Sequence, residues 1–101
     1  MARTAINDIK RGRLASMSEA GRAEFDVAYE ATRLAIMVGE QIRDAREATG
    51  LSQRDLAART GTSQATVVRL EAGRVGATLT TLQRVAAALD LRVAVELSSA
   101  G

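Results

Sequence analysis

Apolar positions recur at the spacing of an α-helix along most of the chain, which contains no proline. This pattern predicts a mainly α-helical protein. We expect a first helix over residues 4–14. A second helix should begin at Ser18. The spacing leaves open whether it ends near Ala31 or continues through Gly39, because a glycine inside a helix costs only about 1 kcal/mol.

From Glu40 onward the helical pattern is more regular and the ends of the helices are marked. Gly50 and Gly61 stand where a residue in the left-handed conformation would end a helix. Ser52 and Asp55 form an acidic variant of the capping box. The other candidate caps are Thr62 or Ser63, and Thr78 or Thr80. The residues expected to face the core are Ile42, Ala45, Ala48, Thr49, Leu56, Ala57, the stem of Arg59, Leu79, Leu82, Val85, Ala86 and Leu89, together with Ala65, Val68 and Leu70 or a close variant of that last face.

Residues 91–97 change to strict alternation of apolar and other positions, which is the pattern of a β-strand. The apolar members are Leu91, Val93, Val95 and Leu97. Because the sequence predicts no second strand, the ladder partner would have to come from another copy of the chain. We therefore expect an antiparallel two-stranded sheet across the two-fold axis of a homodimer. The alternative is a frayed C-terminal tail.

The segment "LSQRDLAARTGTSQATVVRLEAG", residues 51–73, contains two short helical patterns separated by Gly61. Two helices joined by such a tight turn are typical of a helix-turn-helix, whose second helix enters the major groove of DNA. The first turn of the second helix, "TSQAT", is small and polar, as entry into the groove requires. The candidate DNA contacts are Gln53, Ser63, Gln64, Ala65, Thr66 and Arg69, with Arg74 beyond the helix.

The chemistry of these side chains suits DNA. Gln64 can bond an adenine edge or a phosphate, the methyl groups of Ala65 and Thr66 can contact a thymine methyl, and Arg69 can bind guanine or phosphate. Gln53 begins a helix, where a backbone phosphate would meet the helix dipole. Taken singly, Gln53 and Arg69 could equally be solvated surface residues and Thr66 a packing residue, but together on one exposed face they favour DNA. Phosphate steering or simple solvation fits Arg43, Arg54, Arg59 and Arg74.

Together with "TLQRVAAALDLRV", this segment resembles the Cro/C1-type, or Xre-type, helix-turn-helix family over residues 40–90. The matching positions are Leu51, Gln53, Leu56, Ala57, Gly61, Gln64, Leu70, Glu71, Gly73, Leu79, Leu82 and Leu89. The resemblance implies a lambda-repressor-like helical bundle that binds a pseudo-palindromic operator in double-stranded DNA as a homodimer. It also implies a structural ion pair between Arg46 and Glu71. The expected parts are an N-terminal helical extension (1–38), the DNA-binding domain (39–90) and a dimerisation strand with a tail (91–101).

The extension and the terminal strand resemble the HigA and HipB antitoxins of type II toxin-antitoxin systems. That resemblance implies a repressor of its own operon that neutralises a RelE/HigB-like toxin. The alternatives are an antitoxin of a HipA-like kinase and a stand-alone regulator without a toxin. Acidic residues surround the two aromatic side chains, which suits a basic partner, although both aromatics could instead pack in the core. The candidate toxin contacts are Phe25, Tyr29, Glu24 and Glu30.

Composition narrows the possible functions further. The chain has no cysteine and no histidine, which excludes disulfides, thiol chemistry, zinc fingers and imidazole catalysis. It also has no Gly-rich phosphate loop and no convincing pair of catalytic carboxylates, so we expect neither an enzyme nor a cofactor or metal site. Apolar runs are far shorter than the about 18 residues of a membrane span. We therefore expect a cytoplasmic, nucleoid-associated protein that does not enter membranes.

Overall fold

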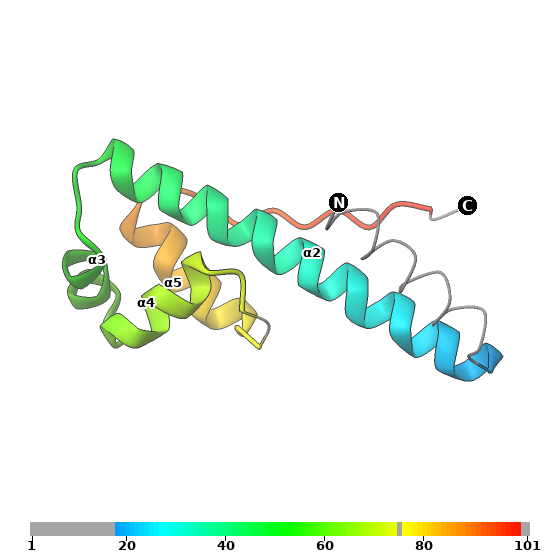
Figure 1. Ribbon diagram of the computed structural model, residues 1–101. Coiled ribbons are helices and arrows are strands. Elements are labelled where there is room, and N and C mark those ends of the chain that lie inside the picture. The colour runs from blue at the N-terminus through cyan, green and yellow to red at the C-terminus, as the bar shows by residue number, and fades with distance from the viewer. Residues whose placement is uncertain (1–17, 75, 100–101) are drawn as a thin grey trace, which may run out of the picture. The chain divides into compact units, whose positions relative to one another are not determined.

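The structure, a computed structural model, describes residues 18–74 and 76–99. These residues form four α-helices and, within the described ranges, no β-strand (Figure 1). The helices are α2 (Glu19–Ala48), α3 (Gln53–Thr60), α4 (Gln64–Glu71) and α5 (Leu79–Ala88). The prediction of a mainly helical protein is therefore confirmed, whereas the helix expected over residues 4–14 lies outside the described residues.

Helix α2 runs for 30 residues without a break, which answers the question left open at Ala31 and Gly39. Ser18 precedes it, and its hydroxyl oxygen accepts a hydrogen bond from the backbone N–H of Gly21 at 3.1 Å. The helix ends at Ala48, and the expected glycine follows it, since Gly50 adopts the left-handed φ of 74°. The chain divides into two compact units between Ala31 and Thr32, and the helix-turn-helix lies in the second unit.

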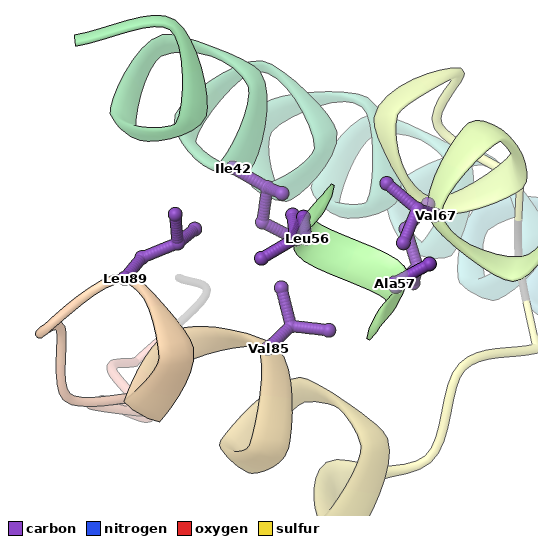
Figure 2. Packing of buried hydrophobic residues seen from close by; sticks show 7 residues of the cluster. Ile42, Leu56, Ala57, Val67, Val85 and Leu89 are labelled. Carbon is purple, nitrogen blue, oxygen red and sulfur yellow. The ribbon is translucent and has the colours of Figure 1, made fainter. Parts of the chain in front are cut away.

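The core of the second unit joins its helices through small and medium-sized apolar side chains. Leu56, Val67 and Val85 are fully buried. Figure 2 shows Ile42, Leu56 and Val85 pointing toward one another from α2, α3 and α5. Burying a side chain of this kind stabilises the folded state by about 1.5–3 kcal/mol. The buried residues of this core are Ile42, Leu56, Ala57, Val67, Leu70, Val85 and Leu89.

The core differs from the sequence prediction mainly on α4. Val67 fills the core with 0% of its surface exposed, whereas Val68 is 42% exposed and Ala65 is exposed as well. The helix starts after Ser63, so Val67 and Leu70 lie three residues apart on its inner side. Two adjacent valines cannot both face inward, and periodicity alone selected the wrong one. Further positions wrongly expected in the core are Ala48, Thr49, Arg59 and Leu79, all of which are exposed.

Local hydrogen bonds fix both ends of α3. The capping box is confirmed: the Asp55 N–H donates to the Ser52 hydroxyl at 3.0 Å, and the Ser52 N–H donates to the Asp55 carboxylate at 3.2 Å. The bond from the Ser52 backbone lowers the pKa of Asp55, because it stabilises the ionised carboxylate. At the other end, Gly61 adopts a φ of 69° as the C-cap, a conformation that glycine adopts without steric cost.

The C-terminal tail, residues 91–99, follows Asp90 and has no regular secondary structure in the single chain. The strand expected over residues 91–97 is therefore absent from this single chain. The expected ladder needs a second chain, so the prediction of a sheet across a dimer remains a proposal. Of the four alternating apolar residues, Val93 is half-buried, while Leu91, Val95 and Leu97 are exposed.

Candidate nucleic-acid interface

The turn between α3 and α4 is held by hydroxyl groups on both of its sides. The Thr60 hydroxyl donates to the carbonyl of Leu56 at 3.0 Å and lies 2.8 Å from the Thr62 hydroxyl. Ser63 then caps α4, because its hydroxyl oxygen accepts a hydrogen bond from the backbone N–H of Thr66 at 3.1 Å. The turn thus sets a fixed direction for α4 relative to α3.

The outer surface of α4 carries side chains that the core leaves free of packing. Gln64, Ala65, Val68 and Arg69 are exposed, whereas Val67 and Leu70 hold the helix from the inside. We call these four exposed residues the outer face of α4. They combine an amide, two apolar groups and a guanidinium along an eight-residue helix, which are the side-chain types that recognise base edges.

Ser63 and Thr66 form a hydroxyl pair beside this face. Their oxygens lie 2.9 Å apart, so one hydroxyl donates to the other. Each hydroxyl has one proton, and the bond between them uses only one. The pair therefore retains one hydroxyl proton that can be donated to a phosphate or a base.

A hollow of about 290 Å³ lies between α4, the following loop and the start of α5. Two arginines, Arg69 and Arg74, line it together with Thr66, Thr78 and Thr81. The arginine side chains and the positive end of the α5 dipole favour negative charge at this hollow. The structure thus brings together three residues that the sequence assigned to DNA, namely Thr66, Arg69 and Arg74.

Behind α4, a buried carboxylate joins three helices. The side chain of Glu71 is 1% exposed. Arg46 from α2 binds it with two hydrogen bonds, Nε to Oε2 at 2.6 Å and Nη2 to Oε1 at 2.9 Å. This bidentate contact with Glu71 raises the pKa of Arg46, and Arg46 also donates to the carbonyl of Leu51 at 2.9 Å. The contact expected between Arg46 and Glu71 is therefore present.

Glu71 also contacts Gln53, which the sequence assigned to DNA, and Arg43, for which the sequence left phosphate steering or solvation open. The Gln53 side-chain amide donates to Glu71 Oε1 at 3.3 Å, and Gln53 is half-buried. Arg43 Nη2 donates to the backbone carbonyl of Glu71 at 3.2 Å, and its Nε lies 3.7 Å from Oε1. An amide nitrogen carries two protons, so Gln53 keeps one donor for a phosphate while it binds Glu71.

Two glycines permit close contact between α2 and the end of α4. A Cβ atom on Gly39 would lie 2.4 Å from the carbonyl oxygen of Leu70 and 2.9 Å from that of Glu71. A Cβ atom on Gly73, which has a φ of 77°, would lie 2.7 Å from the side chain of Ile36. Sequence reasoning missed this contact, because a glycine in a helical pattern gives no sign of which neighbour it accommodates.

The other predicted contacts lie elsewhere. All four candidate toxin contacts are on α2 in the first unit, where Phe25 is half-buried and the other three are exposed. In the second unit, the tail lines an apolar groove of about 350 Å³ with α2 and α5. Its apolar lining includes Val38, Ile42, Leu82, Leu89, Leu91 and Val93. None of the helices in the described part of the chain is long and apolar enough to cross a membrane.

Comparison with known proteins shows which proteins this chain is similar to. An "Uncharacterized HTH-type transcriptional regulator y4dL" of Sinorhizobium fredii (strain NBRC 101917 / NGR234) is 43% identical over 56 residues, which are 55% of this chain and 29% of that protein. The chain therefore spans less than a third of the length of that relative. The crystal structure of the restriction-modification controller protein C.AhdI from Aeromonas hydrophila matches with a TM-score of 0.55 and 33% identity, over 57% of this chain and 88% of that one. Residues 42–95 match the helix-turn-helix family HTH_3, and the chain belongs to that family.

Proposed function

We propose that this protein is a sequence-specific DNA-binding regulator of transcription that acts as a repressor. The observation that carries the proposal is the outer face of α4, where Gln64 and Arg69 are exposed on a capped helix backed by Val67 and Leu70. The names of the two similar proteins, a transcriptional regulator and a controller protein, support regulation.

In the proposed complex, α4 lies in the major groove of double-stranded DNA. Gln64 and Arg69 donate to base edges, and Ala65 contacts a thymine methyl. The spare proton of the hydroxyl pair formed by Ser63 and Thr66 goes to a phosphate or base. Arg74 and the second amide proton of Gln53 bind the DNA backbone and set the position of the helix, without themselves selecting sequence.

The test is a pair of substitutions on the outer face. Gln64→Ala and Arg69→Ala should each weaken binding to a specific duplex by about 1–3 kcal/mol, because each removes a donor to a base edge. The duplex is selected from a random pool with the wild-type protein, and affinity is measured by fluorescence anisotropy at one fixed salt concentration.

The matched controls are Gln83→Ala and Arg84→Ala, the same two changes at exposed positions of α5. They should leave affinity for the selected duplex within about twofold, in line with the small effects usual at surface positions away from an interface. If the α4 variants bind as tightly as these controls, the outer face of α4 does not contact the bases.

We further propose that the protein acts as a homodimer on a pseudo-palindromic site. The apolar groove of about 350 Å³ and the exposed side chains of Leu91, Val95 and Leu97 support a second copy as its occupant. A C-terminal strand paired across the two-fold axis would satisfy the backbone groups of the tail.

The antitoxin role stays a prediction. The exposed carboxylates of Glu24 and Glu30 on the same helix as Phe25 and Tyr29 support a basic protein partner, such as a RelE/HigB-like toxin. The two similar proteins are named as regulators, so regulation of transcription comes first in the proposal. The neighbouring reading frame decides between the two roles. A small basic toxin or a HipA-like kinase encoded there supports an antitoxin, and its absence leaves a stand-alone cytoplasmic regulator.

A further inference from the structure

Two consecutive valines of α4 face in opposite directions. Val67 is 0% exposed and packs in the core, whereas Val68 is 42% exposed. Val68 is the one large hydrophobic residue that α4 leaves exposed. The core does not need it, because Val67 and Leu70 already fill the inner side of the helix.

Val68 shares its surface with residues of the outer face that precede it in the chain. It follows Gln64 by four residues and Ala65 by three, and residues at these spacings are neighbours on a helix. Val68 and Ala65 therefore form a small apolar patch on the outer face of α4. The amide of Gln64 lies beside this patch, and Arg69 directly follows Val68 in the chain.

Within the major groove, the base edge that offers an apolar group is thymine, through its C5-methyl. Valine suits that group because it presents two methyl groups from a side chain with one strongly preferred rotamer in a helix, so little conformational freedom is lost on contact. We propose that Val68 is a specificity-determining residue that contacts the C5-methyl of a thymine. This inference rests on the proposed function and adds to it a position that the sequence had placed in the core.

If Val68 had only a structural role, its replacement would lower the stability of the folded protein. Valine is a weaker helix former than alanine, and an exposed valine adds little to the core. The variant Val68→Ala should therefore fold as stably as the wild type, so that any loss of DNA affinity reports on the contact itself. Thermal unfolding followed by circular dichroism checks this point.

The experiment removes the thymine methyl from the DNA and the valine methyls from the protein in turn. A specific duplex is selected from a random pool with the full chain, and each thymine is then replaced singly by uracil, which lacks only the C5-methyl. The wild type should lose about three- to fivefold in affinity at one thymine per half-site, the value expected for one buried methyl. Val68→Ala should bind the thymine and uracil forms of that position equally, while uracil at every other position has the same effect as with the wild type.

The matched control is Val27→Ala, the same change at a valine of α2 that is 71% exposed. It should keep the wild-type sensitivity to uracil at every position. The inference is overturned if Val68→Ala keeps that sensitivity too, or if the selected half-site has no thymine. Failure to select any specific duplex overturns the proposed function as a whole, so the two failures are distinguishable.

Discussion

At the scale of single residues, Glu71 connects α4 to α2 and α3. Its carboxylate is buried and accepts hydrogen bonds from Arg46 and Gln53, while Arg43 lies close by. A buried carboxylate without partners costs several kcal/mol, so these contacts compensate for burial before they add stability. Their main effect is positional, because they fix the end of α4 against α2 and α3.

The prediction at the residue scale concerns Arg46. Replacing Arg46 with alanine should lower the free energy of unfolding by about 3 kcal/mol, because it leaves a buried carboxylate without its bidentate partner. This is the lower part of the usual range, since Arg43 remains near Glu71. Urea denaturation followed by circular dichroism measures the change.

Arg54→Ala is the matched control for this variant, since Arg54 is an exposed arginine of α3. Its effect should stay within about 0.5 kcal/mol, as is usual for surface substitutions. A loss below about 1 kcal/mol for Arg46→Ala would mean that Arg43 and solvent can replace the missing partner.

At this scale, the sequence predicted which residues take part better than it predicted where their side chains point. Arg46 and Glu71 followed from the family resemblance, and their contact is present. Gln53 was expected at a phosphate, but its amide also donates to Glu71, a contact that depends on how three helices meet and has no local sequence signal. Val67 and Val68 differ by one position in the chain, so only the packed structure decides which of them is buried.

At the scale of elements, the ends of the helices were predictable and their mutual contacts were not. The Ser52 capping box and the left-handed Gly61 depend on residues within one turn, so the sequence carries the information locally. The approach of α2 to α4 at Gly39 depends on backbone atoms 31 and 32 residues further along the chain. The requirement for glycine at position 39 therefore comes from the packing of α2 against α4, which the sequence of α2 alone does not reveal.

The element-scale prediction concerns Gly39. Gly39→Ala should lower the free energy of unfolding by about 1–3 kcal/mol, because the new methyl group meets the carbonyl oxygens of Leu70 and Glu71 and the helices must separate. Urea denaturation again gives the value.

The neighbouring change Glu40→Ala is the control in the same helix, since Glu40 is exposed and should tolerate alanine within about 0.5 kcal/mol. In an open helix, glycine to alanine stabilises by about 1 kcal/mol. An increase of that size in the free energy of unfolding of Gly39→Ala would show that a methyl group fits between α2 and α4, contrary to this prediction.

At the scale of the whole molecule, the exposed apolar side chains of the C-terminal tail favour association with a second copy. A small domain buries a modest fraction of its surface, and association is one way to bury more. The tail has alternating apolar residues but no ladder partner within the described part of its own chain. The ladder expected over residues 91–97 requires a second chain, so the single chain shows no strand there.

The prediction at this scale is a change in oligomeric state. A chain that ends at Asp90 should be monomeric at concentrations where we expect the full chain to be dimeric, because it lacks the residues proposed to pair across the two-fold axis. Multi-angle light scattering coupled to size exclusion measures the mass of each.

Val95→Asp tests the same seam with one substitution, and Ser98→Asp, which adds the same charge on the opposite side of the alternation, is its control. The first should favour monomers and the second should not. A dimer that survives removal of the tail would place the interface on another surface.

The hydroxyl pair formed by Ser63 and Thr66 has a consequence for how imperfect palindromes are bound. Rotation of the two hydroxyl groups, with no movement of heavier atoms, reverses the hydrogen bond between them, so that the other oxygen, 2.9 Å away, then holds the hydrogen that can be donated outward. In the proposed complex, the same backbone arrangement can therefore meet acceptors in two slightly different places. Two half-sites whose acceptors are offset by a fraction of a base step could then share one protein conformation, and operator symmetry need not be perfect.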